Sequence, residues 1–358
     1  MKKVCFFVPS LNIGGVENVF ITYANELAAR GYDVSFVLCH KEGAMLPLVS
    51  NTVTVGDLSD CPLRNSFLPL RRYLKNNVPD YLITGGDFPN LMSILVTRTL
   101  KNKPKVIISK HNYRNTETKD LGWWSFLDLN LQRIFYPKAD MIIAVSFGIK
   151  KYLTGKLSVN PTKVTVLHNP IDIEKIINNS EKDISIAVPD KYIVFVGRVS
   201  KVKNLYYLID SFDKIVDDEL HLIIVGDGTE KKPLEEYSGK KRSRSRIHFL
   251  GSYSNPMPFI KRSQALVLCS LSEAYPTILL EAMALNIPII ATPTEGAKEI
   301  LEGIDGVYVS ESFSNENELA ELIKKALTSN RKELKQYAQN NEKNKVVDKF
   351  ESILNKEI

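Results

Sequence analysis

The 358-residue chain has few cysteines and no long apolar run. The four cysteines include no C-x-x-C pair, which argues against a zinc or redox site, and we expect small core residues in a reducing compartment. No stretch reaches the roughly 18 apolar residues of a transmembrane helix, and the apolar run after Met1 is too short for a signal peptide. The sequence predicts a cytoplasmic protein and leaves peripheral contact with the inner membrane face open.

Familiar nucleotide and metal motifs are also absent. The turn at Gly14-Gly15 does not match G-x-G-x-x-G, and no Gly-Lys-Ser/Thr follows it, so it is neither a dinucleotide fingerprint nor a P-loop. The chain has no D-x-D motif and no His/Asp/Glu cluster with metal-ligand spacing. We therefore expect no cofactor and no essential metal.

The composition is that of a globular protein, 44% hydrophobic and 25% charged, and the length suits two domains. The net charge of +6 fits an anionic ligand, an anionic membrane surface or nucleic acid. Short apolar runs rich in Val and Ile do not alternate with polar residues, which is typical of strands buried on both faces of a parallel sheet. They form two sets: 4–8, 34–38, 81–84, 106–109, 141–145 and 164–167, then 192–196, 221–225, 247–250, 265–269, 287–291 and 307–309.

Helical segments are expected between these runs, at 16–30, 274–285 and 316–327. Alternating strands and helices predict a doubly wound α/β architecture. The polar stretch 169–190 separates the two sets of strands and is interpreted as the linker between two lobes, with room for a short helix.

Two segments carry groups suited to phosphate. Gly14 and Gly15 open a helix after the first strand, where backbone N–H groups can approach a phosphate; a plain tight turn is the alternative. Arg198 and Lys203 follow the first strand of the second lobe, at the sheet edge where ligands of α/β folds bind. Both cations could reach one diphosphate, or they could be two solvated charges at a helix start.

Two glutamates, Glu273 and Glu281, flank a predicted helix start. Pro276 suits the first turn of a helix, so Thr277 and Ile278 would present free backbone N–H groups to a phosphate. Carboxylates accept hydrogen bonds from sugar hydroxyls, so the pair suits a sugar nucleotide. The alternative is a glutamate that complements the helix dipole plus an exposed one.

His111 follows the strand at 106–109 and could face a ligand from the first lobe, or be an ordinary capping or core histidine. Five cations in 240–246 resemble a nucleic-acid patch, but no aromatics are interleaved, so a solvated loop is preferred. The basic stretch 62–79 and the aromatic segment 123–127 fit either an interface with anionic lipid or helices packed on the sheet.

Together these motifs resemble the GT4 retaining glycosyltransferases, which have the GT-B fold. The resemblance covers nearly the whole chain in order: 14–17 resembles the family's first loop, 197–204 its diphosphate site, 226–228 a later turn, and 272–283 its E-x7-E signature. It implies two Rossmann-like domains facing across a cleft. Residues 1–170 would bind the acceptor, with a helix at about 335–358 crossing back onto them, and residues 171–334 would bind the donor.

The resemblance also implies a role for each site residue. Gly15, with Gly14, would donate a backbone N–H to the donor phosphate, and His111 would contact the transferred sugar. In the second lobe Arg198 and Lys203 would neutralise the diphosphate, Glu281 would hold the ribose, Glu273 the transferred sugar, and Tyr253 would lie in the base-binding loop. The family often has glycine where this chain has Ala274 and Asn286; asparagine tolerates positive φ, whereas Ala274 bears on the donor sugar.

The expected activity is metal-independent transfer of a hexose or N-acetylhexosamine with retention, from a UDP-sugar in preference to a GDP-sugar. A glycan or an undecaprenyl-diphosphate-linked glycan is the expected acceptor, as in assembly of polysaccharide, O-antigen or capsule. Same-face attack is favoured over a covalent intermediate. A GT-B sugar-nucleotide epimerase, a nucleic-acid binder using 240–246 and a non-catalytic partner subunit are the alternatives.

Overall fold

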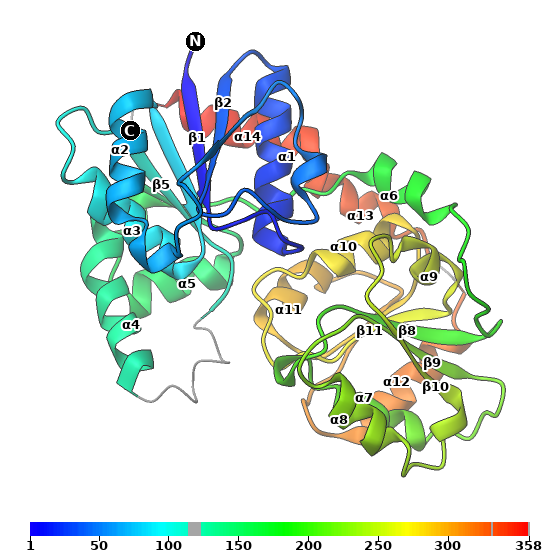
Figure 1. Cartoon of the computed structure of the whole chain (residues 1–358). Coiled ribbons are helices and arrows are strands. Elements are labelled where there is room, and N and C mark those ends of the chain that lie inside the picture. The colour runs from blue at the N-terminus through cyan, green and yellow to red at the C-terminus, as the bar shows by residue number, and fades with distance from the viewer. Residues whose placement is uncertain (114–122, 331, 357–358) are drawn as a thin grey trace. The chain divides into compact units, whose positions relative to one another are not determined.

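A computed structural model describes residues 1–113, 123–330 and 332–356, and within α4 it describes side chains from 128 onward (Figure 1). The chain divides into two compact units. The first unit consists of Met1–Pro170 together with Lys343–Ile358, and the second unit is Ile171–Glu342.

The first unit is built on a parallel sheet of seven strands. Their spatial order is β3 (Thr54–Asp57), β2 (Asp33–Leu38), β1 (Lys3–Val8), β4 (Tyr81–Gly85), β5 (Lys105–Lys110), β6 (Met141–Ala144) and β7 (Val164–Val166). Side chains of β1 alternate between two apolar clusters, with Phe6 in one and Phe7 in the other. Both faces of the sheet are therefore buried, as the unbroken apolar runs predict. The helices of this unit are α1 (Gly15–Ala29), α2 (Phe67–Asn77), α3 (Asp87–Thr97), α4 (Trp123–Phe135), α5 (Phe147–Lys156) and α14 (Lys343–Asn355).

The second unit repeats the plan with a parallel sheet of six strands. Their order is β10 (Ile247–Gly251), β9 (His221–Val225), β8 (Tyr192–Val196), β11 (Ala265–Leu268), β12 (Ile289–Ala291) and β13 (Val307–Val309). The helices are α6 (Ile173–Ser180), α7 (Leu205–Asp213), α8 (Lys231–Ser238), α9 (Met257–Arg262), α10 (Thr277–Ala284), α11 (Glu295–Leu301), α12 (Glu316–Thr328) and α13 (Lys335–Ala338). In both units the chain order reverses beside the first strand, and ligands of such sheets bind at the carboxyl ends of the strands there.

Two expectations about the ends of the units are refined. The stretch 169–190 contains α6, which begins where the side chain of Asp172 accepts a hydrogen bond from the Lys175 N–H. The return to the first unit begins at Lys343, later than the expected 335. Asn286 explains the difference, because its Oδ1 accepts hydrogen bonds from the N–H groups of Leu334 and Lys335 and ties that segment to the second unit.

Helix α14 packs on α1 in the first unit. The rings of Tyr23 and Phe350 stack with centroids 4.3 Å apart, and Lys2 Nζ donates to the carbonyl of Leu354 at 2.8 Å. Val347 and Phe350 belong to the same apolar cluster as β1, so the last helix completes the core of the first unit.

Candidate functional site

The loops after β8 and β9 lie against each other at the carboxyl edge of the second sheet. Gly226 has φ +149°, and a Cβ there would lie 1.8 Å from the carbonyl oxygen of Gly197, so only glycine fits. The Val199 N–H donates to the Asp227 carbonyl at 2.9 Å, which fixes the loop that carries Arg198. The Arg198 side chain is exposed on this loop, which agrees both with a ligand contact and with a solvated charge.

Lys203 ends a short 3-10 helix at Lys201–Lys203, where Asn204 takes the left-handed conformation with φ 55°. Its Nζ lies 2.6 Å from Oε1 of Glu273, and both side chains are mostly buried, 21% and 14% exposed. The structure thus brings together Lys203 and Glu273, to which the family resemblance gives separate roles. Their mostly buried ion pair holds the Glu273 loop against the loop that carries Arg198.

Ser270 is a further residue of this cluster, which the sequence analysis missed. Its buried hydroxyl donates to the same Oε1 of Glu273 at 2.6 Å, and its own carbonyl accepts from the Thr292 hydroxyl at 2.6 Å. Oε1 of Glu273 therefore has two donors, whereas Oε2 has no hydrogen-bond partner in the described part of the chain. The second oxygen is the one left to accept a hydrogen bond from a ligand.

Helix α10 begins at Thr277, later than the expected 274. Pro276 is the residue before the helix and has extended backbone (ψ 104°), so it does not lie in the first turn. The first N–H groups of any helix lack partners inside it, so those of Thr277 and Ile278 remain suited to a phosphate. Ala274 packs against Gly296, where a Cβ would come within 2.5 Å of the Ala274 carbonyl, and the Gly296 N–H donates to the Glu273 carbonyl.

Glu281 lies one turn into α10 and is partly buried among apolar neighbours. Burial raises the pKa of its carboxyl group to about 7. The charged form therefore has an energetic cost in the free protein that hydroxyl donors of a ligand would offset. Tyr253 follows β10 and packs edge-on against Phe259, with ring centroids 4.7 Å apart, and no contact links it to Glu281 or Lys203 among the described residues.

The remaining predicted residues belong to the first unit. Gly14 precedes α1 in extended conformation, and at Gly15, its first residue, a Cβ would meet nothing within 4 Å. His111 follows β5, with Nε2 2.8 Å from the Ser109 hydroxyl and its ring edge-on to Phe20. Burial, with the charge of Lys110, lowers the pKa of His111 to about 4. The imidazole is therefore neutral at pH 7, suited to hydrogen bonding and unsuited to acid catalysis.

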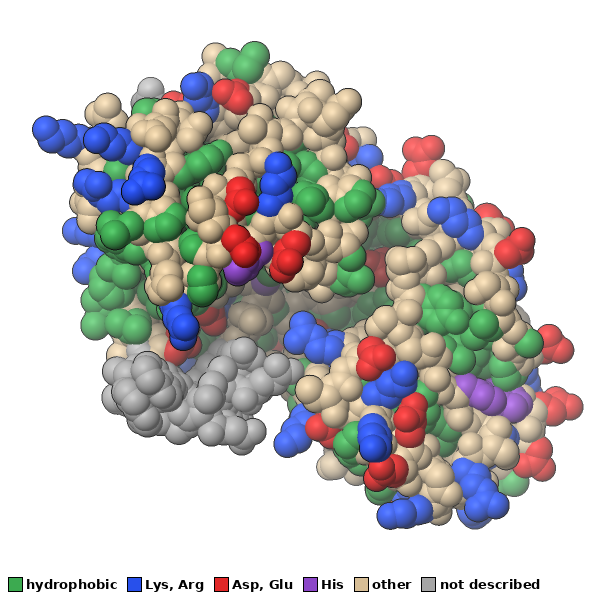
Figure 2. All heavy atoms as spheres, viewed as in Figure 1, with side chains coloured by type: hydrophobic (Ala, Val, Ile, Leu, Met, Phe, Trp, Pro, Cys, Tyr) green, Lys and Arg blue, Asp and Glu red, His purple; other side chains and the backbone are tan. Residues whose placement is uncertain are grey.

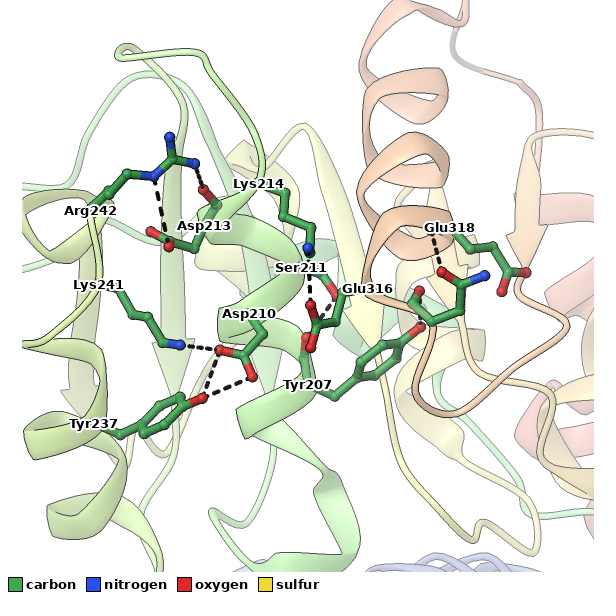
Figure 3. A network of polar contacts seen from close by, with 11 residues as sticks. Tyr207, Asp210, Ser211, Asp213, Lys214, Tyr237, Lys241, Arg242, Glu316 and Glu318 are labelled. Atoms are coloured by element: carbon green, nitrogen blue, oxygen red, sulfur yellow. Dashed lines mark hydrogen bonds and ion pairs between the residues drawn. The ribbon is translucent and has the colours of Figure 1, made fainter.

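The basic run 240–246 is part of the structure of the second unit (Figure 3). Lys241 pairs with Asp210 at 2.5 Å, and Asp213 Oδ1 accepts from the N–H and hydroxyl of Ser243. Arg246 donates to the backbone carbonyls of three residues at 2.8 to 3.1 Å: Ile215, Asp217 and Leu220. Lys241 and Arg246 are therefore engaged within the unit, while Lys240 and Arg244 are exposed, and this arrangement does not favour a nucleic-acid patch.

Replacing Arg246 with alanine should lower the free energy of unfolding by about 2 kcal/mol, because three carbonyls lose a charged donor. Arg244→Ala is the matched control, since Arg244 is an exposed arginine on the same short 3-10 helix, two residues earlier. Urea unfolding of both variants measures the difference. Equal stability of the two variants would show that the Arg246 contacts do not hold this loop.

The basic stretch 62–79 forms helix α2, which buries Leu70 and Leu74 and exposes Leu68, Arg72 and Lys75. Figure 2 shows basic side chains beside hydrophobic ones over this part of the first unit. The helix therefore packs on the unit, as one interpretation expects, and keeps the basic outer face that the other requires. The side chains of the aromatic segment 123–127 lie outside those described.

Among the described residues, none of the helices has both the length and the apolar character of a membrane span. The same residues hold no group of three or more His, Cys, Asp or Glu side chains placed to bind a metal ion.

Comparison with known proteins assigns the two units. Residues 13–175 match the family model described as Glycosyltransferase Family 4, and residues 177–344 match that of Glycosyl transferases group 1. The chain belongs to glycosyltransferase family 4. With its two doubly wound units, the glycosyltransferase has the GT-B fold that the sequence analysis predicts.

Relatives span nearly the whole glycosyltransferase. The N-acetylgalactosamine-N,N'-diacetylbacillosaminyl-diphospho-undecaprenol 4-alpha-N-acetylgalactosaminyltransferase of Campylobacter jejuni is 27% identical over 91% of this chain and 90% of its own. The amylovoran biosynthesis glycosyltransferase AmsD of Erwinia amylovora is 25% identical, with 90% and 89% covered. The structure of Anabaena HepE in complex with UDP and glucose has a TM-score of 0.80 at 18% identity, covering 99% of both chains, and supports the fold.

Proposed function

We propose that this glycosyltransferase moves a hexose or N-acetylhexosamine from a UDP-sugar, with retention, to a glycan or an undecaprenyl-diphosphate-linked glycan in bacterial surface-polysaccharide assembly. The observation that carries the proposal is the cluster at one sheet edge of the second unit. There Lys203, Ser270 and Glu273 are joined by hydrogen bonds of 2.6 Å.

The donor is held, in this proposal, by charges and dipoles that are already in place. Arg198 and Lys203 neutralise the diphosphate, and the first N–H groups of α10 approach it. Glu281 accepts hydrogen bonds from the ribose hydroxyls and Oε2 of Glu273 from the transferred sugar. Since Lys203 also binds Glu273, one cation lies between the leaving diphosphate and the sugar-binding carboxylate.

The chemical step then needs fixed positive charge where the leaving group becomes negative. The bond from the anomeric carbon to the phosphate oxygen breaks, and the acceptor hydroxyl attacks the same face while its proton passes to the departing phosphate. In this proposal Gly15 gives a backbone N–H to the phosphate, and the neutral His111 hydrogen-bonds the sugar. The reaction requires no metal, because the cations of the protein take that role.

Two of the similar proteins support the lipid-linked acceptor and the uridine nucleotide of this proposal. The name of the Campylobacter jejuni enzyme states a lipid-linked, undecaprenol diphosphate acceptor, and HepE was solved with UDP. A lipid-linked acceptor lies at a membrane, and the outer face of α2, with Leu68 exposed beside Arg72 and Lys75, suits peripheral binding to anionic lipid. We place the enzyme on the cytoplasmic side.

A nucleotide-sugar screen tests the proposal. UDP- and GDP-sugars are compared by thermal shift and by slow hydrolysis without acceptor, and NMR of the product reports the anomeric configuration. We expect UDP-sugars to raise the melting temperature more than GDP-sugars and the α-configured donor to give an α-linked product. If no nucleotide shifts the wild type, the proposal is wrong.

A further inference from the structure

A buried lysine and a carboxylate meet at the carboxyl edge of the first unit's sheet, outside the residues assigned so far. Lys110 is the last residue of β5, with 1% of its side chain exposed, and its Nζ contacts Oδ1 of Asp87, the first residue of α3. The fully buried Tyr136 donates its hydroxyl to the same oxygen at 3.0 Å. Burying a lysine is costly even when it is paired, so stabilisation alone is a weak explanation of this pair.

The partners of Asp87 are themselves fixed. Gln132 Oε1 lies 3.4 Å from Lys110 Nζ, and the Asn90 side-chain amide donates to the Tyr136 hydroxyl at 3.3 Å and to the Ser109 carbonyl at 3.1 Å. The residues that make these contacts belong to α3, α4 and β5, and they fix the position of the Asp87 carboxylate. Asp87 still keeps 17% of its side chain exposed, and Oδ2 has no hydrogen-bond partner in the described part of the chain.

The turn before Asp87 lies close to the other predicted residues of this unit. A Cβ at Gly85 would come within 2.6 Å of Val16 Cγ1, so the turn abuts the start of α1, next to Gly15. The same Cβ would lie 3.0 Å from the ring of Phe20, which packs edge-on against His111. Asp87 therefore shares one edge of the sheet with Gly15 and His111.

We propose that Asp87 recognises a hydroxyl group of the acceptor sugar through Oδ2, with Lys110 as the positioning residue that fixes its other oxygen. A carboxylate with one oxygen tied to buried donors and the other open at a ligand-binding edge is a directed acceptor for a hydroxyl. The inference rests on the proposed function, because it takes the first unit as the acceptor side.

The test compares Asp87→Asn with Asp80→Asn. Asp80 is a matched control in the same unit: its Oδ2 accepts from the Lys3 N–H at 2.7 Å, at the amino edge of the same sheet. The acceptor probes are octyl glycosides of the common hexoses and N-acetylhexosamines, each also made with one hydroxyl removed, and the donor is the UDP-sugar chosen by the screen. Asp87→Asn should raise the acceptor KM about 10- to 100-fold and leave donor KM and acceptor-free hydrolysis at wild-type values. The deoxy acceptor that lacks the recognised hydroxyl should have the same KM with Asp87→Asn as with the wild type.

Lys110→Met adds a second readout. It should raise the acceptor KM as Asp87→Asn does, and the double variant should be no worse than either single one, because both changes act on one contact. Circular dichroism and melting of each variant report folding, and Asp87→Asn alone decides the question if Lys110→Met unfolds. An unchanged acceptor KM in folded Asp87→Asn, or an equal loss with every deoxy acceptor, overturns the assignment. If the wild type does not hydrolyse any nucleotide sugar, the result would count against the proposed function and not against the role of Asp87.

Discussion

Replacing Lys203 with alanine should lower kcat/KM for transfer by about 10²- to 10³-fold, the range seen when one fixed donor to a developing charge is removed. Lys203 Nζ lies 2.6 Å from Glu273 Oε1 at the edge where we place the diphosphate. Without it the leaving phosphate loses a cation, and the mostly buried Glu273 loses the partner that fixes its direction. Initial rates of acceptor-free hydrolysis and of transfer measure the effect.

Lys201→Ala is the matched control for this prediction. Lys201 carries the same charge on the same short 3-10 helix, but its side chain is exposed and has no ion pair among the described residues. We expect wild-type rates from Lys201→Ala and partial activity from Lys203→Arg, since a guanidinium keeps the charge but not the shape of an ammonium. Similar rates for the two alanine variants would remove Lys203 from the mechanism.

The architecture could be predicted from the sequence because its strands are buried on both faces. Such strands form unbroken apolar runs, and the runs at 192–196, 221–225 and 307–309 match β8, β9 and β13. Strand β3 was missed because its four residues include Gly56 and Asp57 and are only partly buried at the edge of the sheet. An edge strand needs less apolar sequence, so its pattern is weak.

The contacts inside the site could not be predicted in the same way. Lys203 and Glu273 are 70 residues apart in the chain, and they meet only because β8 and β11 are neighbours in the sheet. Ser270 stands three positions before Glu273, a spacing that could have suggested the hydrogen bond, but a serine in a loop has many other uses. Asp87 carried no motif, and its role follows from the lysine buried beneath it.

The basic run 240–246 is a second case in which the contacts could not be predicted from the sequence. Its cations are visible in the sequence, but the carboxylates that engage them, Asp210 and Asp213, lie about 30 residues earlier on α7. Charge pattern alone therefore overstated the surface charge available for a partner. Three-residue spacing on a helix puts both acids on one face, toward the loop (Figure 3).

The affinity of the wild type for a UDP-sugar should rise as the pH rises through about 7, and Glu281→Gln should abolish this rise. Burial raises the pKa of Glu281 to about 7, so the residue is neutral in mild acid. Only the ionised carboxylate accepts hydrogen bonds from two ribose hydroxyls at once. We expect Glu281→Gln to bind the UDP-sugar of the screen about 10-fold or more weakly than the wild type at pH 8 and about equally at pH 5.5, by isothermal titration calorimetry. A UDP-sugar is used because its phosphates, unlike the terminal phosphate of UDP, carry no proton that titrates near pH 7.

The stability of the nucleotide-free wild type should fall as the pH rises through the same range. A carboxyl group whose pKa is raised by folding contributes stability that is fully present below its ordinary pKa and is lost as the pH rises through about 7. Glu281→Gln removes that loss, so the variant should melt above the wild type at pH 8. Glu295→Gln, at an exposed position at the start of α11, should change neither property. A pH slope of UDP-sugar binding that survives in Glu281→Gln would move the ribose contact to another residue.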